Sequence, residues 1–458
     1  MIASLTLSTL AEISDGKLVG DDVSFVSVST DSRAIKKDEL FIALKGPNFN
    51  GNLYVASVEE KGAVAALVED VQEEGLPQVK VKSTLKALGD VAKYNRDQFK
   101  GKVLAVTGSS GKTSVKEMLA AILSEEGQTL STSGNLNNDI GAPLTLLRID
   151  DTHKFAVIEL GASAVGEIAY TAALTQPDVA IITNAANAHL EGFGSYDNIV
   201  TAKGEIVEAL GVDGIAILNA DDPAFEKWQA LASPRKFLSF SLYNDKNADV
   251  WAESIKLSSG LSGSGSEFEL CWSSGRVFVS LPLPGKHNIA NALAAACAAN
   301  ALDVKWESIK AALSNLNSVK GRLEITESES GYTVINDTYN ANPSSTRAAL
   351  DVLANAKGFR GVILGDMGEL GTDAKSLHEQ AGRYAKEGRA DVLYACGQFA
   401  DSVVAGYGKG AFSFASKAEL IERLMKELQQ GATYLVKGSR SAAMEEVVDE
   451  MLKQKVVA

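Results

Sequence analysis

The feature that most limits what this chain can fold into is a Gly-rich segment, TGSSGKTS at residues 107–114, which joins an apolar run of strand length to an amphipathic segment of helical length. In such a loop, glycine lets backbone N–H groups approach phosphate oxygens, and the following helix adds the positive end of its dipole. A general P-loop also has Gly at the position of Val106, so this loop is tighter. We predict a phosphate-binding loop rather than a plain Gly/Ser turn, made of Gly108, Ser109, Ser110, Gly111, Lys112, Thr113 and Ser114.

Around this loop, apolar runs of strand length alternate with helical segments, which is typical of βαβ units and a mostly parallel sheet. The central strand candidates are residues 103–107, 155–160, 179–183 and 214–219. At about 150 residues per domain, 458 residues predict about three domains. We expect an α/β protein with a small mixed α/β N-terminal domain at 1–99, a central P-loop parallel-sheet ATPase domain at 100–319 and a C-terminal Rossmann-like domain at 320–458.

The two outer domains are predicted from the same alternation. In the first, short β-like runs precede a helical segment at 84–99, and the runs are 23–28, 40–44, 63–68 and 78–81. In the last, β-like runs alternate with helical segments, one of which follows Ser439, and the runs are 333–336, 361–364, 392–396 and 433–436. The Gly/Ser-rich segment 258–266 lies between β-like runs, so we expect a hairpin or surface loop rather than a linker.

Charge and composition exclude several classes of protein. Asp and Glu total 58 against 44 Lys and Arg, with no basic block, so we expect no nucleic-acid partner, although a local basic pocket for a small anion stays open. The three cysteines lie far apart, which favours a reducing compartment over a disulfide framework. No apolar run reaches the roughly 20 residues of a membrane helix. We expect a cytoplasmic protein with no membrane insertion, and a monomer, because no apolar stripe demands a partner.

Two side chains near the ends of predicted strands could serve a nucleotide site beside Lys112, which can reach terminal phosphates, and Thr113, which can ligate Mg²⁺. Glu159 ends the strand at 155–160 and could bind Mg²⁺, or could be a capping or paired carboxylate. His189 follows the strand at 179–183 and could equally be a structural histidine. Lys203 would by itself be interpreted as a solvated helix lysine.

Nine segments of this chain resemble the Mur ligase family of cell-wall synthesis, and the match runs from about residue 30 to the C-terminus. They are TGSSGKTSVKEM, GNLNNDIGAPLTLL, VIELGA, AHLEGFGS, AKGEI, LPLPGKHNIANALAA, DTYNANPSS, LGDMGELG and VKGSRSAAMEEVV. The tight P-loop is the family's own form. The resemblance implies that ATP joins a carboxylate to an amine through an acyl phosphate, and that the donor is UDP-N-acetylmuramoyl-tripeptide and the acceptor D-alanyl-D-alanine.

The resemblance also assigns catalytic roles. It implies that Lys112 holds the β- and γ-phosphates, that Thr113 and Glu159 bind one Mg²⁺ and that His189 helps to bind a second. It further implies that CO₂ carbamylates Lys203, which turns a cation into an anionic oxygen ligand for the second Mg²⁺. Arg322 resembles the arginine that reaches the γ-phosphate from the domain junction.

Binding positions are implied with surface or capping roles still open. On the ATP side they are His287, Asn288 and Asn291 in the central domain, and Asp337, Tyr339, Asn340 and Asn342 in the C-terminal domain. For the UDP-sugar they are Ser32, Arg33, Lys45 and Gly46, of which Lys45 and Arg33 suit a diphosphate. For the acceptor dipeptide they are Asn137, Asn138, Lys437, Ser439 and Arg440, although the two asparagines could instead serve the nucleotide.

Three other functions remain open from the sequence. The chain could be a sibling ligase that adds a different amino acid, a folylpolyglutamate-synthase-like enzyme that shares the central domain, or a nucleotide-binding regulator that uses the P-loop as a switch. Against the regulator, Glu159, His189 and Lys203 supply more metal-site chemistry than a binding protein needs.

Overall fold

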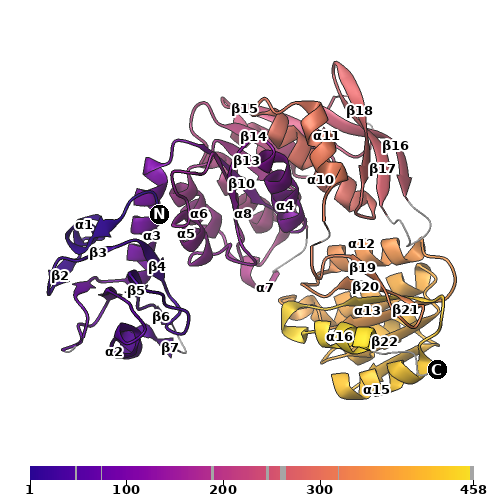
Figure 1. The fold of residues 1–458 in the computed structure, drawn as a ribbon. Helices are drawn as coiled ribbons and strands as arrows, with labels where there is room; N and C mark the ends of the chain where they lie inside the picture. The colour runs from indigo at the N-terminus through magenta and orange to yellow at the C-terminus, as the bar shows by residue number, and fades with distance from the viewer. Residues whose placement is uncertain are drawn as a thin grey trace.

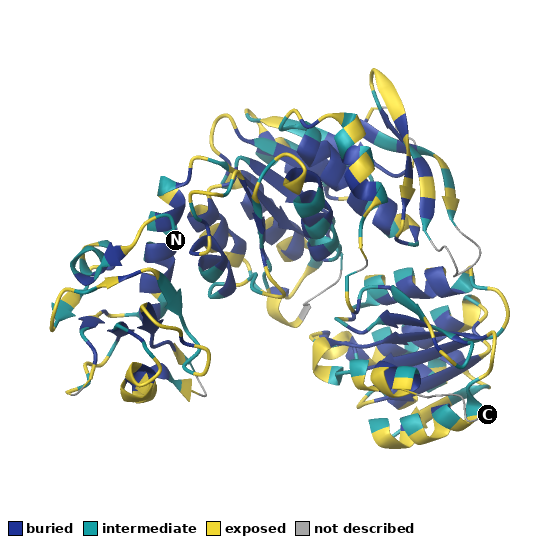
Figure 2. Cartoon of the chain, in the orientation of Figure 1, coloured by how far each residue is buried: buried dark blue, intermediate teal, exposed yellow. Residues whose placement is uncertain are grey.

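The computed structural model describes residues 1–46, 49–73, 75–186, 190–243, 247–257, 265–317 and 319–453. The chain forms three α/β bodies that follow one another in sequence (Figure 1). In each body, buried residues fill the space between sheet and helices and exposed residues lie outside (Figure 2). The predicted three-domain α/β fold is confirmed.

The N-terminal domain has a mixed sheet with strand order β2-β9-β8-β5-β4 and two small antiparallel pairs, β1-β3 and β6-β7. Its elements are β1 (Leu5–Thr6), α1 (Leu7–Ile13), β2 (Lys17–Val19), β3 (Ser24–Phe25), β4 (Ser27–Ser29), β5 (Glu39–Ile42), β6 (Lys45–Gly46), β7 (Phe49–Asn50), the 3₁₀ turn η1 (Gly51–Tyr54), α2 (Val55–Glu59), β8 (Ala65–Val68), β9 (Gln78–Lys80) and α3 (Thr84–Gln98). The Ser83 hydroxyl caps α3 by accepting from the Lys86 N–H. The four predicted strand regions and the helix are therefore confirmed.

The central domain is built on a sheet whose described strands have the order β11-β12-β10-β13-β14-β15-β16-β17-β18. Its elements are β10 (Lys102–Thr107), α4 (Lys112–Ser124), β11 (Thr129–Ser131), α5 (Gly141–Leu146), β12 (Phe155–Glu159), α6 (Glu167–Thr175), β13 (Val179–Ile182), α7 (Leu190–Phe193), α8 (Tyr196–Glu208), β14 (Ile215–Asn219), α9 (Phe225–Ala232), β15 (Lys236–Ser241), β16 (Val250–Leu257), β17 (Ser266–Trp272), β18 (Gly275–Leu281), α10 (Lys286–Asn300) and α11 (Trp306–Ser314). In this sheet order, every neighbouring pair from β11 to β16, including those of β10, is parallel. The four strands predicted here are confirmed, each to within one residue.

The register of this sheet positions the site. Val106 lies opposite Glu159, and Thr107 lies opposite Ile182. The carboxyl ends of β10, β12 and β13 therefore meet at one edge, which is where open parallel sheets bind ligands.

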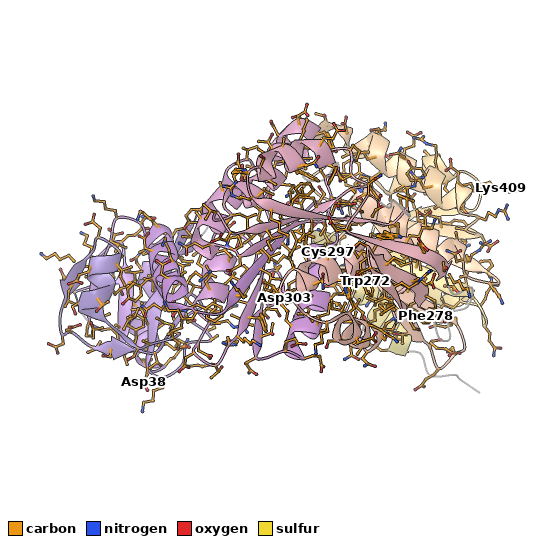
Figure 3. All side chains as sticks on the ribbon, turned by 90° about the horizontal axis from the view of Figure 1, so that it is seen from above. Asp38, Trp272, Phe278, Cys297, Asp303 and Lys409 are labelled. Carbon is orange, nitrogen blue, oxygen red and sulfur yellow. The ribbon has the colours of Figure 1, made fainter. Side chains whose placement is uncertain are left out.

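The last three strands, β16, β17 and β18, form an antiparallel extension of the central sheet. Leu257 pairs with Ser266, which agrees with a hairpin around the Gly/Ser-rich segment, although residues 258–264 themselves lie outside the described residues. At the other end of β17, Trp272 stacks on Trp306 of α11 with ring centroids 4.4 Å apart. Figure 3 shows Trp272 and Phe278 on this extension, well apart from Asp38 in the N-terminal domain.

The C-terminal domain has a sheet with order β19-β20-β24-β21-β22-β23, in which only the β19-β20 pair of the described strands is antiparallel. Its elements are β19 (Glu324–Glu327), β20 (Thr333–Asp337), α12 (Pro343–Ala354), β21 (Arg360–Gly365), the 3₁₀ turn η2 (Gly371–Asp373), α13 (Ala374–Glu387), β22 (Val392–Cys396), α14 (Ala400–Tyr407), β23 (Ala411–Phe414), α15 (Lys417–Glu427), β24 (Thr433–Lys437), the 3₁₀ turn η3 (Arg440–Ala442) and α16 (Glu445–Lys453). The predicted strands and the helix after Ser439 are confirmed. None of the helices in the described ranges combines the length and the hydropathy that a bilayer span requires.

The apolar cores connect the domains unequally. Helix α3 packs against α5 and α6, and a single apolar cluster runs from Leu88 of α3 to Ala172 of α6. The two apolar clusters of the C-terminal domain, by contrast, contain only residues of that domain. Within the described residues, the C-terminal domain thus has its own core, whereas the N-terminal domain shares one with the central domain.

A buried histidine of the C-terminal domain should make stability depend on pH. His378 of α13 is 1% exposed, its Nδ1 lies 2.7 Å from the Ala374 carbonyl oxygen, and its Nε2 accepts from the Met367 N–H at 2.8 Å. Burial lowers the pKa of His378, against smaller opposing effects of the Ala374 carbonyl and Asp366. The neutral ring is therefore the folded form, and stability is full above the ordinary histidine pKa and falls as the pH drops toward the lowered one.

This pH dependence can be measured on the whole chain. Between pH 7.5 and 5.5, the wild-type melting temperature should fall more than that of His378→Gln, because the histidine takes up a proton on unfolding and glutamine does not titrate. This proton uptake can lower the free energy of unfolding by at most about 1.4 kcal/mol per pH unit. His153→Gln is the control, since that ring lies in a turn beside Asp150. Equal falls in wild type and His378→Gln would contradict the assignment.

Candidate active site

The Gly-rich loop has the predicted setting, between β10 and the first residue of α4. Gly108 and Gly111 have backbone φ angles of 147° and 80°, which residues other than glycine rarely adopt. A Cβ at Gly108 would lie 1.9 Å from Thr183 Oγ1, and one at Gly111 would lie 2.4 Å from Asn291 Oδ1. Both glycines are therefore required by backbone conformation and by close packing. Lys112 Nζ folds back to donate to the Gly108 carbonyl at 2.7 Å, across the loop.

The segment after β13 holds this loop in shape. The Ser110 N–H donates to Asn184 Oδ1 at 3.1 Å, and the Ser109 N–H donates to the Asn184 carbonyl at 3.0 Å. Ser109 Oγ donates to the Ala186 carbonyl at 3.0 Å. His189 lies outside the described residues.

Thr113 and Glu159, which the sequence predicts to bind Mg²⁺, lie in direct contact. Thr113 Oγ1 donates to Glu159 Oε2 at 2.7 Å, and Asn137 Nδ2 donates to Glu159 Oε1 at 2.7 Å. Glu159 is only 2% exposed. A hydroxyl and a buried carboxylate are hard oxygen donors, so this pair fits Mg²⁺. Among the described residues, no group of three or more His, Cys, Asp or Glu side chains is gathered for a metal.

Arg322 brings the C-terminal domain to the same point. Its Nη2 donates to Thr113 Oγ1 at 2.8 Å, and its guanidinium lies 4.2 Å from the centre of the Tyr339 ring. Burial lowers the pKa of Lys112; the carboxylate of Glu159 opposes this effect and Arg322 adds to it. Two cations from two domains thus face the Gly-rich loop, which suits a polyphosphate.

Lys203 is buried on α8, so its interpretation as a solvated helix lysine is wrong. It is 2% exposed, and its Nζ lies 5.1 Å from the centre of the Phe193 ring. Burial and the charge of Lys112 lower the pKa of Lys203 to about 7, against the opposing charges of Glu205 and Glu167. Periodicity could not show this burial, because it depends on how α8 packs against α6 and α9.

The predicted adenine-side residues lie together on α10. His287, Asn288 and Asn291 all line a cleft between the central and C-terminal domains, which is called the cleft below. Asn288 Nδ2 donates to the Pro284 carbonyl at 2.8 Å, which fixes the start of the helix. Burial lowers the pKa of His287 to about 4, with Asp337 opposing and Lys437 reinforcing the effect. The side chain is therefore a neutral imidazole at physiological pH.

The C-terminal wall of the cleft contains a buried ion pair. Lys437 is 2% exposed, and its Nζ donates to Asp337 Oδ2 and, at 2.9 Å, to the Asn340 carbonyl. Asn342 lines the cleft, and its side chain is the N-cap of α12, where Oδ1 accepts from the Ser345 N–H at 2.8 Å. The capping role that the sequence left open for Asn342 is therefore present.

The acceptor candidates divide between the two sides of the cleft. Asn137 lies beside Glu159 on the central-domain side, and Asn138 Oδ1 accepts from the Gly141 N–H at 2.9 Å. Arg440 lies on the opposite, C-terminal side and pairs with Glu445 at 2.5 Å. Ser439 is 4% exposed, and its N–H donates to the Asp366 carbonyl at 2.8 Å.

The candidates for the UDP-sugar are not in this cleft. Lys45 and Gly46 form β6, with Lys45 exposed, and Arg33 pairs with Asp31 at 2.8 Å while 86% exposed. Ser32 accepts from Lys61 Nζ through its carbonyl at 2.7 Å. All four residues lie in the N-terminal domain, and Figure 1 shows β6 on the side of that domain that faces the C-terminal domain.

Most of the remaining candidates line one cleft of about 850 Å³ between the central and C-terminal domains, whereas Gly108, Lys203 and Ser439 are not part of its lining. Its lining also includes residues that sequence reasoning missed: Asn184, Asn219, Phe240 and Glu369. Asn184 follows β13 and Asn219 ends β14, so the strand-end argument used for Glu159 could have found both. Phe240 carried no comparable signal, and Glu369 lies in the segment LGDMGELG, which resembles the family but was assigned no role.

Fold and cleft together define a P-loop nucleotide-binding protein in which the C-terminal domain completes the site. Three domain models of one family match the chain: Mur ligase family, catalytic domain, at residues 24–96; Mur ligase middle domain at 106–299; and Mur ligase, glutamate ligase domain, at 321–440. The chain belongs to the Mur ligase family, as its motifs indicated.

Individual relatives are similar over nearly their whole length. The chain is 46% identical to UDP-N-acetylmuramoyl-tripeptide--D-alanyl-D-alanine ligase of Escherichia coli (strain K12), over 97% of this chain and 98% of that protein. A crystal structure of MurF from Acinetobacter baumannii superposes with a TM-score of 0.92 at 36% identity, covering 99% of this chain and all of that one. MurF ligase from Thermotoga maritima in complex with ADP superposes with a TM-score of 0.83 at 27% identity, covering 93% and 97%.

Proposed function

We propose that this chain is the ATP-dependent ligase that joins D-alanyl-D-alanine to the C-terminal carboxylate of UDP-N-acetylmuramoyl-tripeptide, giving ADP and phosphate, in peptidoglycan precursor synthesis. The observation that carries the proposal is the junction at which Thr113, Glu159 and Arg322 meet beside the Gly-rich loop. It fits a γ-phosphoryl group held between two domains. The near full-length similarity to ligases of this name supports the choice of substrates.

The chemistry explains why these side chains are needed. A carboxylate is a poor electrophile, so one of its oxygens first attacks the γ-phosphorus and ADP leaves. The acceptor nitrogen then attacks the acyl carbon of the resulting acyl phosphate, loses a proton and expels phosphate. Both steps concentrate negative charge, which Lys112 and Arg322 neutralise from opposite sides.

The Mg²⁺ ions that we propose would supply Lewis-acid stabilisation of the phosphoryl oxygens. Thr113 and Glu159 would hold one ion, and His189 with carbamylated Lys203 would hold the second. The lowered pKa of Lys203 supports the carbamylation, because only the neutral amine can react with CO₂. Its burial then keeps the resulting anion out of bulk water.

The domains would divide the substrates among them. Residues 1–99 would bind the UDP-sugar through Ser32, Arg33, Lys45 and Gly46. Residues 100–319 would bind ATP through the Gly-rich loop, which includes Ser114, and through His287, Asn288 and Asn291. Residues 320–458 would close over the nucleotide with Asp337, Tyr339, Asn340 and Asn342, and would bind the acceptor near Ser439 and Arg440. We further propose that the protein is cytoplasmic, because ATP and the UDP-linked donor are cytoplasmic nucleotides, and that it is a monomer, as the sequence led us to expect.

Acceptor dependence tests the proposal. Phosphate release should require ATP, Mg²⁺, UDP-N-acetylmuramoyl-tripeptide and D-alanyl-D-alanine together, and mass spectrometry should find the UDP-linked pentapeptide. Equal release with meso-diaminopimelate or L-glutamate in place of the dipeptide would instead indicate a sibling ligase or a folylpolyglutamate-synthase-like enzyme. Nucleotide binding without turnover under any combination would favour a regulator.

A further inference from the structure

Lys437 is a buried charged residue to which the function as described so far gives no role. It ends β24, in register with Asp337 at the end of β20 and with Leu364 of β21. The carboxyl ends of these three strands therefore meet at one edge of the C-terminal sheet, where Lys437 and Asp337 both line the cleft. The sequence made Lys437 a candidate for binding the acceptor dipeptide, but its contacts favour a different role.

The ammonium group of Lys437 is already surrounded by oxygen atoms of its own domain. The residue is 2% exposed. Its Nζ donates to Asp337 Oδ2, to the Asn340 carbonyl at 2.9 Å and to the Asp337 carbonyl at 3.4 Å. Because a lysine has three N–H donors, each donor has an oxygen to meet. In this arrangement Lys437 holds both ends of the segment 337–340 and keeps no donor for the carboxylate of a dipeptide.

The other oxygen of the Asp337 carboxylate holds the backbone beside Arg322. Asp337 Oδ1 accepts from the Leu323 N–H at 3.1 Å. Leu323 has a backbone φ angle of 50°, in the left-handed region that residues other than glycine rarely adopt. Such a conformation persists only where the surrounding contacts enforce it, and the hydrogen bond to Asp337 is one of these contacts. The ion pair with Lys437 therefore reaches the residue that follows Arg322.

A second connection joins the same segment to Arg322. The Tyr339 N–H donates to the Gly321 carbonyl at 3.1 Å, and the Tyr339 ring lies 4.2 Å from the Arg322 guanidinium. Tyr339 lies within the segment 337–340, whose two ends Lys437 holds. Both the backbone next to Arg322 and the ring beneath its guanidinium are thus attached to contacts of Lys437.

We propose, on the basis of the function proposed above, that Lys437 is a positioning residue for Arg322. It holds Asp337 and the segment 337–340, and these hold the Arg322 guanidinium where the γ-phosphoryl group is transferred. Each carboxylate oxygen can accept a second hydrogen bond, so Asp337 can still contact the nucleotide. A misplacement of about 1 Å in such a site can lower the rate about 100-fold, so the role should be visible in kcat.

Steady-state kinetics of Lys437→Met separate positioning from acceptor binding. Methionine keeps most of the side-chain length but has no donor. We expect kcat to fall about 30- to 100-fold, while the KM for D-alanyl-D-alanine changes less than about twofold. A rise of that KM by about tenfold or more with kcat unchanged would show that Lys437 binds the acceptor, and would overturn the proposal.

Lys417→Met is the matched control. Lys417 lies in the same domain on α15, forms an ion pair with Glu446 at 2.8 Å and donates to the Ala443 carbonyl at 3.2 Å. It therefore repeats the kinds of contact that Lys437 makes, but it is not part of the cleft lining. We expect Lys417→Met to leave kcat and all KM values within about twofold of the wild type. A loss of kcat equal to that of Lys437→Met would reduce the role of Lys437 to general stability of the domain.

A double-mutant cycle tests whether Lys437 acts through Arg322. In an Arg322→Ala background, Lys437→Met should lower kcat by less than about threefold, because the group that it positions is absent. Losses that multiply in full would overturn the proposal, since they would show that the two residues act independently. If the wild type formed no amide product from D-alanyl-D-alanine, the proposed function itself would have failed, which is a different outcome from an additive cycle in an active enzyme.

Lys437→Arg keeps the test decisive if Lys437→Met does not fold. Removing one partner of a buried ion pair is destabilising, whereas arginine retains the charge opposite Asp337. Its planar guanidinium cannot meet the same three oxygens as an ammonium does, so kcat should fall between the values of Lys437→Met and the wild type. Melting temperatures identify the folded variants. An equal loss of kcat from Lys437→Arg with and without Arg322 would contradict the positioning role.

Discussion

Replacing Lys203 with alanine should lower kcat/KM at least about 1,000-fold, a loss of about 4 kcal/mol of transition-state stabilisation, and a short carboxylic acid should restore part of the activity. The expected loss is large because the substitution removes the anionic oxygen ligand that we assign to the second metal site. Of the two residues assigned to that site, only His189 would remain. Acetate or propionate could enter the space that the lysine leaves and supply a carboxylate in the same place.

The local environment favours this chemistry over an ordinary lysine role. A pKa of about 7 leaves a large fraction of the Lys203 amine neutral at physiological pH, whereas an exposed lysine is almost fully charged there. The neighbouring charge of Lys112 contributes to this shift, so the residue that is to hold phosphates also helps to keep Lys203 reactive. A permanently cationic amine at 2% exposure would be costly to bury without a close counter-ion.

Phosphate release measured against acetate concentration is the test. Lys203→Met is the informative partner variant, because its side chain keeps the space filled and should allow no rescue. Lys227→Ala on α9 serves as the surface control, since Lys227 is 63% exposed and pairs with Asp197. Melting temperatures of all variants identify any loss that is due to unfolding. Full activity of Lys203→Ala without added acid would remove the proposed role.

Much of this site could be predicted because it depends on strand ends. In a parallel sheet, adjacent strands end at the same edge, so locating β10 and β12 from their apolar runs was enough to place Thr113 near Glu159. The glycine pattern gave the loop for an equally local reason, since φ values of 147° and 80° require glycine whatever surrounds them. Short-range sequence patterns contain this information in full.

Other parts of the site depend on packing between elements distant in sequence, which no local pattern records. The burial of Lys203 is a property of α8 against its neighbours, and a lysine on a helix gives no sign of it. The contact from Arg322 to Thr113 joins residues 209 positions apart. Glu369 was missed because its position follows from the anchoring of its loop by Asp366 and His378.

The separate core of the C-terminal domain gives the Arg322 contact its importance. Within the described residues, the apolar clusters of that domain include no residue of the central domain, so polar contacts such as Arg322 to Thr113 are important for joining the two domains. Thr113 is also a proposed Mg²⁺ ligand. We therefore expect the Arg322 guanidinium to leave this hydroxyl for the phosphates when nucleotide binds. In the structure it lies 4.2 Å from the centre of the Tyr339 ring.

Arg322→Ala should consequently lower kcat about 1,000-fold, as removal of an arginine that stabilises a transferring phosphoryl group does elsewhere. The Kd for ATP, measured by equilibrium titration, should change less than tenfold, because Lys112 and the loop backbone remain. Arg322→Lys should recover little, since a lysine keeps the charge but not the planar, stacked fork of donors.

Arg347→Ala provides the matched control for this variant. Arg347 lies in the same domain, is exposed, and stacks on Tyr384 at 4.9 Å, so it repeats the cation–π contact of Arg322 away from the cleft. It should leave both kcat and ATP affinity within twofold of the wild type. If Arg322→Ala weakened ATP binding as much as it lowered kcat, the arginine would be holding the bound nucleotide uniformly rather than stabilising the phosphoryl group during transfer. An Arg322→Ala enzyme as active as Arg347→Ala would show that the contact with Thr113 serves only to join the two domains.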